Sequence, residues 1–417
     1  MTTLPATIDR AACERLDAGD PLRAFRDRFL CDDDLVYLDG NSLGRIPRET
    51  PRRLATLLGD EWGRGLVRSW TSAGWMESPL RCGDAIAEII GAGPGEVLVT
   101  DSTSVDLFKL AAAVMDARPR RRVLLTEHEN FPTDRYIAGG VTELLGAGRM
   151  LRSVPRQEIS AAIDDDTALL LLTHVDFRTG ERFDMRALTD AAHAKGALVL
   201  WDLSHSTGAI NVDLHAAGAD LATGCGYKYL NGGPGAPAYL FVNTPLQSEL
   251  RNPIRGWLGH ESPFTYEPEY RGATGIRQWM SGSPPIIAIA SLRVAVDIAR
   301  EAGMQQLEDK AAQLTELFIR LSDERLAEHG FELATPRDAS RRGAQVSLRH
   351  PSGYPVVRAL IERSVVGDFR DPDICRFGLA PLYTRFVDVW DGVDRLDAVM
   401  RSGDFRREEF QSRVPIT

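Results

Sequence analysis

Four short runs of this chain are apolar at nearly every position, and they constrain the fold more than any other feature. They are RVLLTE (122–127), TALLLLTHV (167–175), GALVLWDLS (196–204) and PAYLFV (237–242). A strand with one solvated face alternates apolar and polar residues, whereas a strand covered on both faces is apolar throughout. Such strands usually belong to a parallel sheet with helices on both sides, so the runs predict an α/β fold.

An amphipathic helix is expected between the second run and the third. In DMRALTDAAHAKG (184–196), Asp184 suits an N-cap, Leu188 and Ala192 share one helical face, and Gly196 suits the C-terminal cap. A strand, a helix and a second strand in this order form a βαβ unit. We therefore interpret the middle of the chain as a doubly wound α/β domain.

The C-terminal third follows a different pattern. Two long helices are expected at 286–302 and 304–329, followed by strand-like AQVSLRH (344–350), a short helix at 354–364 and strand-like CRFGLA (375–380). Helices followed by separated strands are typical of a smaller α+β domain.

The predicted fold class is therefore α/β with two domains, because 417 residues exceed what one core usually supports. The large, mainly parallel, doubly wound domain is expected at 61–290. The smaller α+β domain is expected at 1–60 and 291–417.

Composition excludes several classes of function. The net charge of −10 argues against nucleic acid as a partner. No apolar run approaches the roughly 18 residues of a membrane span, and the first 30 residues lack the apolar segment of a signal peptide. The five cysteines are scattered without a C-x-x-C pair, and no H-E-x-x-H occurs. These features predict a reduced, cytoplasmic protein without a metal site.

One lysine stands in an unusual setting, ATGCGYKYLNGGPG (222–235). Lys228 lies between two tyrosines with no neighbouring charge. A lysine in an apolar environment loses its charge readily and can form a Schiff base. The glycine-rich NGGPG (231–235) is neither a Walker P-loop nor a dinucleotide fingerprint, so we interpret it as a tight turn and expect no nucleotide.

Other reactive side chains follow the predicted strands, at the sheet edge where open α/β proteins bind ligands. Asp202 and His205 follow one run, and Phe131 and Asp134 follow another within ENFPTDRY (129–136). A carboxylate at the end of a buried strand is costly unless it is paired. The alternative for Asp202 is a helix N-cap or a local ion pair.

A third group opens a helix after EVLVT (96–100). Ser102, Thr103 and Ser104 begin an amphipathic segment. Free backbone N–H groups, hydroxyls and the helix dipole together suit an anion such as phosphate. The alternative is an ordinary N-cap.

These parts together predict a site for pyridoxal 5'-phosphate (PLP). A lysine can bind the cofactor covalently, a buried carboxylate can keep the pyridine nitrogen protonated, and an aromatic ring can stack on the pyridine. The helix start supplies the phosphate site. Each element alone is weakly specific, whereas their joint occurrence at strand ends is strongly specific.

Six motifs point to a known family. They are YLDGNSLG (37–44), NFPTD (130–134), WDLSHSTGA (201–209), YKYLNGGPG (227–235), GWLGH (256–260) and RFGLAPLY (376–383). In these motifs and over nearly its whole length, the chain resembles kynureninase, a fold-type I PLP family of the aspartate aminotransferase superfamily. The resemblance implies hydrolysis of L-kynurenine to anthranilate and L-alanine, and of 3-hydroxykynurenine to 3-hydroxyanthranilate, in tryptophan catabolism or NAD biosynthesis.

The resemblance also implies roles for residues that match the family motifs. Lys228 would bind PLP, Asp202 would face its ring nitrogen with His205 nearby, Phe131 would stack on the ring, and Asp134 would join the polar contacts.

The remaining cofactor contacts implied by the resemblance come from several segments. Thr103, Ser104 and Tyr227 would bind the phosphate, and Thr173 would lie beside the cofactor. Trp257 and Ser283 would reach the phosphate from the second subunit of a homodimer.

For the substrate, Arg376 would clamp the α-carboxylate, a task that suits a planar guanidinium. Trp70 is a candidate for the aromatic end, with a core tryptophan as the alternative. Lys228 would take the α-proton. Tyr227 would donate a proton later, with a pKa that a neighbouring phosphate and imine would lower.

Two other functions compete with this prediction. The first is another fold-type I activity, such as a cysteine desulfurase or an aminotransferase. A desulfurase needs a nucleophilic cysteine on a mobile loop, whereas Cys375 precedes a strand-like run. The second is an inactive binding protein on the same fold, which the intact Lys228, Asp202 and Arg376 argue against.

Overall fold

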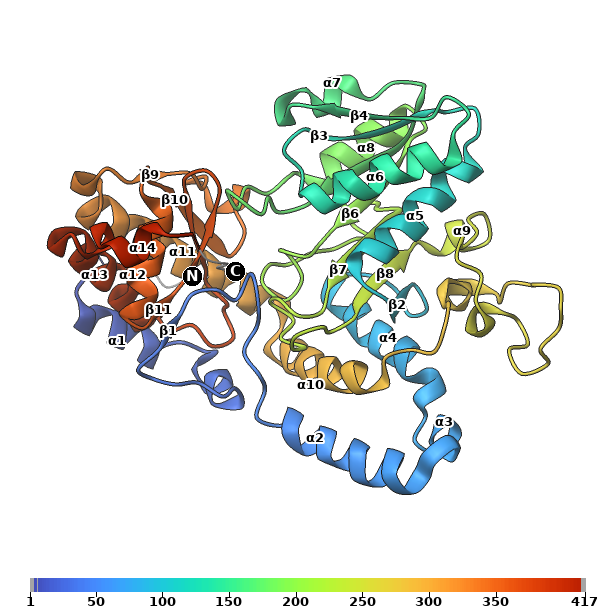
Figure 1. Cartoon of the computed structure of the whole chain (residues 1–417), viewed down its shortest axis with the longest axis horizontal. Helices are drawn as coiled ribbons and strands as arrows, with labels where there is room; N and C mark the ends of the chain where they lie inside the picture. Colours follow the sequence, from blue (N-terminus) through green and yellow to red (C-terminus); the bar gives the residue numbers. More distant parts are fainter. Residues whose placement is uncertain (1–3, 6, 414–417) are drawn as a thin grey trace.

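The four apolar runs lie in one seven-stranded sheet of the computed structural model, which describes residues 4–5 and 7–413 (Figure 1). Residues 1–3, 6 and 414–417, part of the predicted small domain, lie outside the described residues. In spatial order the strands are β2 (Val97–Thr100), β8 (Ala238–Val242), β7 (Leu221–Cys225), β6 (Leu198–Asp202), β5 (Thr167–Thr173), β3 (Val123–Glu127) and β4 (Met150–Val154).

Five neighbouring strands of this sheet, from β7 to β4, run parallel, which confirms the prediction of a mainly parallel sheet. Strand β8 runs antiparallel to both of its neighbours. Its five residues are all buried. A strand covered on both faces is apolar in either direction, so its sequence does not reveal this reversal.

Strand β7 was not predicted, because its residues are small rather than apolar. Its sequence LATGC carries no alternation and few β-branched side chains. Gly224 is needed there, since an added Cβ would lie 2.5 Å from the hydroxyl of Tyr239 on β8. The strand still matters for function, because the segment of Lys228 follows it directly.

Two apolar cores cover the two faces of the sheet, because successive strand side chains point to opposite sides. One face packs against α4 (Ser78–Ile90), α8 (Met185–Ala194) and α10 (Ile286–Ala302). The other face packs against α5 (Thr103–Ala117) and α6 (Pro132–Leu145). The predicted helix at 184–196 is confirmed, and Asp184 caps it by accepting a hydrogen bond from the Ala187 backbone N–H at 3.0 Å.

A third apolar core forms the smaller lobe, at the left of Figure 1. It contains a four-stranded antiparallel sheet with the order β12-β13-β10-β9. The helices and strands of this lobe are α1 (Arg10–Ala18), β1 (Val36–Tyr37), α11 (Met304–Arg325), β9 (Glu332–Leu333), β10 (Gln345–Arg349), α12 (Gly353–Glu362), β11 (Val365–Val366), β12 (Asp368–Arg370), β13 (Ile374–Gly378), α13 (Phe386–Ser402) and α14 (Glu408–Gln411).

The N-terminal segment joins this lobe through β1, which pairs with β11, and through α1, which packs on α13. The helices and strands expected in the C-terminal third are confirmed, and the second long helix continues as a 3-10 turn until Gly330. Helix α10 packs on the large sheet, across the boundary expected at residue 290. The division into domains stays a prediction.

Two segments extend from the large lobe. We call residues 50–77 the arm; it contains α2 (Thr50–Thr56), a π-helical stretch (Leu57–Gly65) and α3 (Ser69–Ser72), and runs along the bottom of Figure 1. We call residues 248–285 the long loop; it follows α9 (Thr244–Gln247) and projects at the right. Among the described residues, no helix combines the length and the apolar character that crossing a membrane requires.

Candidate active site

Lys228 lies where three neighbouring parallel strands end. Its segment follows β7, and the last residues of β5 and β6, Thr173 and Asp202, are partners in the sheet register. The Nζ of Lys228 lies 2.9 Å from Nε2 of His205 and 5.9 Å from the centre of the Phe131 ring. The fold thus brings together side chains from segments about 100 residues apart in the sequence, as their positions after the strands predict.

His205 is buried and uncharged in this arrangement. Burial lowers its pKa well below the usual range, and the nearby Lys228 lowers it further. A neutral imidazole carries one N–H and one acceptor nitrogen. The positively charged amine of Lys228 can only donate a hydrogen bond, so Nε2 of the neutral ring is the acceptor.

Asp202 is a buried carboxyl group at the end of β6. Burial raises its pKa, whereas a hydrogen bond from Ser204 and the positive charge of Lys228 oppose the increase. The backbone N–H of Ser204 donates to Oδ1 at 2.8 Å. Asp202 therefore accepts the hydrogen bond that turns the chain after the strand, and its carboxyl group interacts with the charge of Lys228. Its role toward a cofactor stays a prediction.

Asp134 is the second buried acid of the site. Burial raises its pKa well above the usual range, and the charge of Asp202 raises it further. The hydroxyl of Thr173 lies within donating distance of two oxygens, Oδ2 of Asp134 at 3.0 Å and Oδ1 of Asn130 at 2.5 Å. Asn130, which our sequence analysis did not select, stands inside the NFPTD motif and closes this chain of hydrogen bonds.

The start of α5 has the properties of an anion site. Ser102 is the N-cap residue, and its side chain forms no capping hydrogen bond. Thr103 and Ser104 are half-buried in the first turn. The first N–H groups of a helix lack partners inside the helix, so here they are available to a phosphate. Ser102 therefore caps the helix without a side-chain hydrogen bond, and the phosphate role of this helix start stays a prediction.

The pKa of Tyr227 is raised in the chain alone, because the thiol of Cys225, burial of the phenol and the charge of Asp202 all disfavour the phenolate. The lowered pKa expected from the sequence concerns the phenol beside a bound phosphate and imine, so it stays a prediction. A phenol that keeps its proton still suits a proton donor.

Arg376 lies on β13 of the small lobe and is 2% exposed. Its guanidinium forms a two-pronged ion pair with Asp368, in which Nε lies 2.8 Å from the carboxylate. Nη1 donates to the carbonyl of Phe177 at 2.6 Å, and Nη2 donates to Oγ of Ser42 at 3.0 Å. Of its five N–H groups, four therefore have acceptors within the described residues, and one on Nη1 remains for a ligand.

Phe177 connects Arg376 with the lysine end of the site. Its ring packs edge-on against that of Phe131, with centres 5.1 Å apart. Sequence reasoning missed Phe177 and Asp368, because neither lies in a motif that we recognised. Ser42 stands within YLDGNSLG and could have been selected from that motif.

Three predicted residues lie elsewhere in this chain. Trp70 lies in the arm and packs edge-on against Trp75 at 5.9 Å, while Trp257 packs edge-on against Phe264 in the long loop at 5.7 Å. Ser283 is exposed near the end of that loop. In the part of the chain that the structure describes, no hydrogen bond or ring contact joins these three residues to Lys228 or Asp202.

Cys375 does not have the properties of a desulfurase nucleophile. It lies within β13 with no exposed surface, and burial raises the pKa of its thiol. A nucleophilic cysteine is partly exposed and has a lowered pKa. The structure therefore favours the main prediction over the desulfurase alternative.

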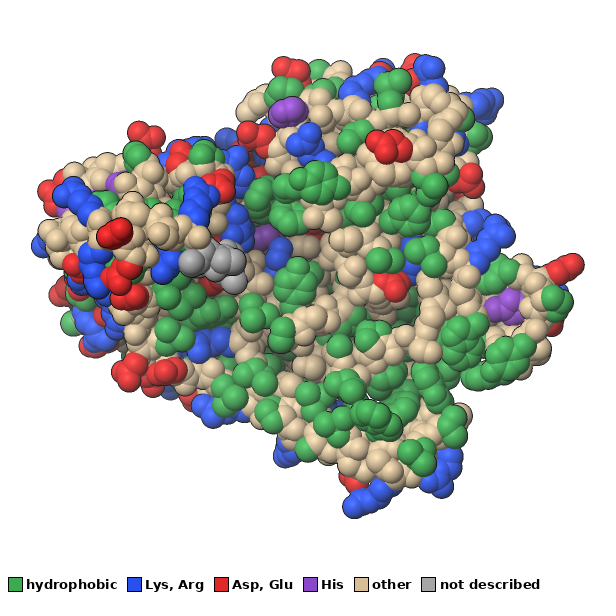
Figure 2. Space-filling model, in the orientation of Figure 1, with side chains coloured by type: hydrophobic (Ala, Val, Ile, Leu, Met, Phe, Trp, Pro, Cys, Tyr) green, Lys and Arg blue, Asp and Glu red, His purple; other side chains and the backbone are tan. Residues whose placement is uncertain are grey.

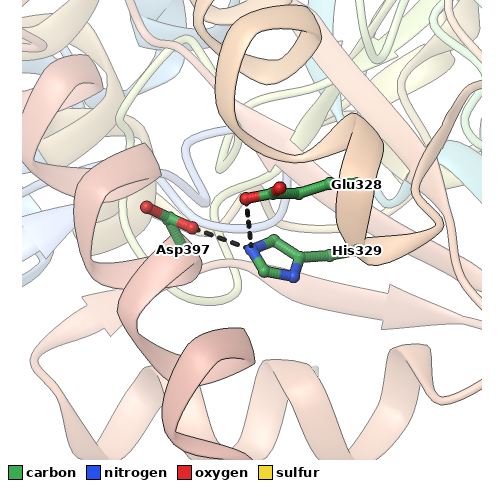
Figure 3. Close-up of side chains that lie close together, drawn as sticks. All are labelled: Glu328, His329 and Asp397. Carbon is green, nitrogen blue, oxygen red and sulfur yellow. Dashed lines mark hydrogen bonds and ion pairs between the residues drawn. The ribbon is translucent and has the colours of Figure 1, made fainter.

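A cluster of possible metal ligands lies in the small lobe, far along the chain from Lys228. Glu328, His329 and Asp397 point toward one another (Figure 3). Nε2 of His329 lies 2.8 Å from Asp397 and 3.9 Å from the exposed Glu328. Asp397 also pairs with Arg401 at 2.8 Å. We interpret the group as an ion-pair network that fastens the turn after α11 to α13.

Comparisons with known proteins agree with this geometry. The family model described as "Kynureninase C-terminal domain" matches residues 307–396. A kynureninase from Pseudomonas fluorescens is 46% identical over 413 residues, covering 98% of this chain and 99% of the relative. One from Burkholderia pseudomallei is 45% identical over 407 residues, covering 96% and 98%.

Solved structures show the same fold at low identity. An apo cysteine desulfurase from Thermococcus onnurineus matches with a TM-score of 0.79 and 17% identity, covering 91% of this chain and 98% of that chain. The cysteine desulfurase CsdA from Escherichia coli matches with a TM-score of 0.74, also at 17% identity, covering 91% and 98%. These structures establish the fold alone, whereas the near full-length relatives establish the family: the chain belongs to the kynureninase family.

Proposed function

We propose that this protein is a PLP-dependent hydrolase that converts L-kynurenine to anthranilate and L-alanine in tryptophan catabolism. The observation that carries the proposal is Lys228 beside His205 and Asp202 at the carboxyl ends of parallel strands, in a chain 46% identical to a kynureninase. An aminotransferase or a desulfurase on the same fold is the alternative.

The residues present fit PLP. Lys228 offers an amine near the partly exposed face of the Phe131 ring, Asp202 offers a buried carboxylate, and α5 offers an open helix start. Lys228 would hold the cofactor, Asp202 would face its ring nitrogen, and Phe131 would stack on it. Thr103 and Ser104 would bind its phosphate. When bound, PLP supplies an electron sink for negative charge at the α-carbon of the substrate.

The chain's own residues supply proton transfer and orientation. Lys228 takes the α-proton, and His205 Nε2 holds the amine in place through their 2.9 Å hydrogen bond. The free N–H on Nη1 of Arg376 donates to the α-carboxylate, while Oγ of Ser42 accepts from Nη2. Tyr227, whose raised pKa keeps the phenol protonated, donates a proton to the alanine carbon that loses the aromatic fragment.

We also infer that the protein works as a homodimer. Apolar side chains gather on the surface of the arm and the long loop (Figure 2). Val67 and Tyr266, one from each segment, are 76% exposed. A groove of 670 Å³ with apolar walls lies between Ile46, Pro234 and Ile287. Exposed apolar surface of this kind is typical of an interface. A second copy would bring Trp257 and Ser283 to the phosphate, which one chain does not do.

Two finer proposals concern the substrate and the compartment. L-Kynurenine is the preferred substrate over 3-hydroxykynurenine, which a comparison of the two kcat/KM values tests. A higher value for the hydroxylated substrate contradicts the preference. The protein resides in the cytoplasm, a proposal supported by its five free thiols.

The proposed activity is tested on the purified protein with PLP. We expect a visible absorbance band from the bound cofactor, and anthranilate fluorescence when L-kynurenine is added. The band without anthranilate would move the assignment to another fold-type I activity, for which transfer of the amino group to a keto acid is the next assay. Absence of the band after adding PLP would contradict the cofactor assignment.

A further inference from the structure

Gln345 of the small lobe lies against the lysine site without a role in the account above. It is the first residue of β10 and is 1% exposed. Its Nε2 donates to the carbonyl of Phe177 at 3.2 Å. Its Oε1 has no hydrogen bond of ordinary geometry, and neither has Nδ1 of the buried His205, although the two side chains face each other. Two buried polar atoms thus lack partners at one contact.

The hydrogen positions follow from the lysine. Because His205 is neutral and its Nε2 accepts from Lys228, the single imidazole hydrogen lies on Nδ1. A buried N–H without an acceptor is unfavourable. The side-chain oxygen of Gln345 is the acceptor that faces this hydrogen.

We propose that Gln345 is a positioning residue, which holds His205 as the Nδ1–H tautomer and thereby keeps Nε2 an acceptor for the amine of Lys228. The effect on catalysis rests on the proposed function. The tautomer itself does not, because it depends only on side chains of this chain.

The surroundings of Gln345 fix its side chain in this place. The hydroxyl of Tyr229, next to Lys228, donates to the carbonyl of Ala344 at 3.1 Å and ties the start of β10 to the lysine segment. Gly180 leaves room for the glutamine, since an added Cβ would lie 2.8 Å from Cγ of Gln345.

Gln345 also connects the two ends of the site. The carbonyl of Phe177 accepts from Nε2 of Gln345 and from Nη1 of Arg376. The side-chain amide of Gln345 therefore connects Arg376, which would bind the substrate carboxylate, with His205, which orients the lysine. We expect substitution of Gln345 to alter the proton-transfer step more than the binding of substrate.

The tautomer is measured by nitrogen NMR on the full chain without cofactor, with ¹⁵N-labelled histidine rings. His205→Asn assigns the resonances. We expect His205 as the Nδ1–H tautomer in the wild type, a shift toward Nε2–H in Gln345→Met, and retention of Nδ1–H in Gln345→Glu, which keeps an oxygen acceptor. Gln247→Met is the matched control, since this buried glutamine also donates to backbone carbonyls, those of Gly95 and Val242.

Kinetics of the cofactor-loaded protein give the second readout. We expect kcat of Gln345→Met to fall about tenfold, the low end of the losses known for residues that orient a metal-bound histidine, while KM stays within about twofold. An Nε2–H tautomer in the wild type, or an unchanged tautomer in Gln345→Met, would overturn the proposal. Because the tautomer is read without cofactor or substrate, this outcome is separate from failure of kynurenine hydrolysis.

Discussion

The site around Lys228 and the exposed segments of the large lobe differ in whether their side chains find partners within one chain. Lys228, Asp202, Thr173 and Asp134 contact partners from the same chain, and all but Lys228 are buried. In the arm and the long loop, apolar side chains such as Val67 and Tyr266 are exposed instead. This difference is what the proposed dimer predicts, in which the sheet would supply the reactive half of the site and a second copy would supply the rest.

Replacement of Lys228 is expected to cause the largest loss of activity. Lys228→Ala removes the proposed base at the strand ends, so kcat should fall by about 10²–10⁴-fold or more. The visible band of bound cofactor should also disappear, and circular dichroism should stay unchanged, because the side chain is only half-buried. Full activity in this variant would refute the role of Lys228.

The next largest effect is expected at the buried ion pair between Asp368 and Arg376. Asp368→Ala leaves the buried guanidinium of Arg376 without its carboxylate partner, so the free energy of unfolding should fall by about 3–5 kcal/mol. Urea denaturation measures this. Asp323→Ala is the control, since its pair with Arg337 is exposed and should contribute no more than about 1 kcal/mol. Equal losses of unfolding free energy in the two variants would contradict a stabilising role that is specific to the buried pair.

A pH-dependent effect is expected at Glu127, at the end of β3. Burial raises the pKa of Glu127 to about 7 from its ordinary 4.5, against the opposing charge of Arg156. The folded state therefore keeps a proton that the unfolded chain releases, so the free energy of unfolding falls by about 3 kcal/mol as pH rises from 4.5 to 7. Glu127→Gln should remove this decrease. Parallel stability curves for the two proteins would contradict the assignment.

In the exposed arm, unlike at the buried ion pair, we expect a substitution to leave the stability of the folded chain nearly unchanged. Val67→Asp should change the stability of the folded chain by about 0.5 kcal/mol or less, because the side chain is exposed in one copy. The same change should dissociate the dimer, because it places a charge in the proposed interface. Sedimentation velocity distinguishes the two states, and a dimer that persists would exclude the arm from the interface.

The smallest effect is expected at Trp70. Its ring packs against Trp75 in the arm, so Trp70→Phe should change KM for L-kynurenine by about twofold or less if it is a packing residue. A KM increase of about tenfold or more, about 1.4 kcal/mol, would instead support the aromatic-end role predicted from the sequence.

The sequence predicted those parts of the fold that local patterns determine. Helix α10 was predicted from its periodicity with both ends correct, and α8 from Asp184 and its apolar stripe. Strand β7 was missed because small residues carry little signal, and the direction of β8 because burial on both faces hides it.

In the candidate site too, only the features that local sequence patterns determine could be predicted. Residues at strand ends could be selected from order alone, since parallel strands end at one edge. Asp368 and Gln345 could not, because their roles depend on pairing within the small lobe and on contacts with residues more than 100 positions away. The raised pKa of Tyr227 depends on Cys225, whose side-chain contact with the phenol is set by the three-dimensional fold.

The claim that two copies share each site is tested most directly by complementation. Lys228→Ala and Trp257→Ala chains are purified separately, dissociated, mixed and reassociated with PLP, and anthranilate production from L-kynurenine is followed. The account predicts weak activity in each variant and recovery in the mixture, because a hybrid dimer has one site with Lys228 from one chain and Trp257 from the other. A mixture no more active than its components would contradict the shared site.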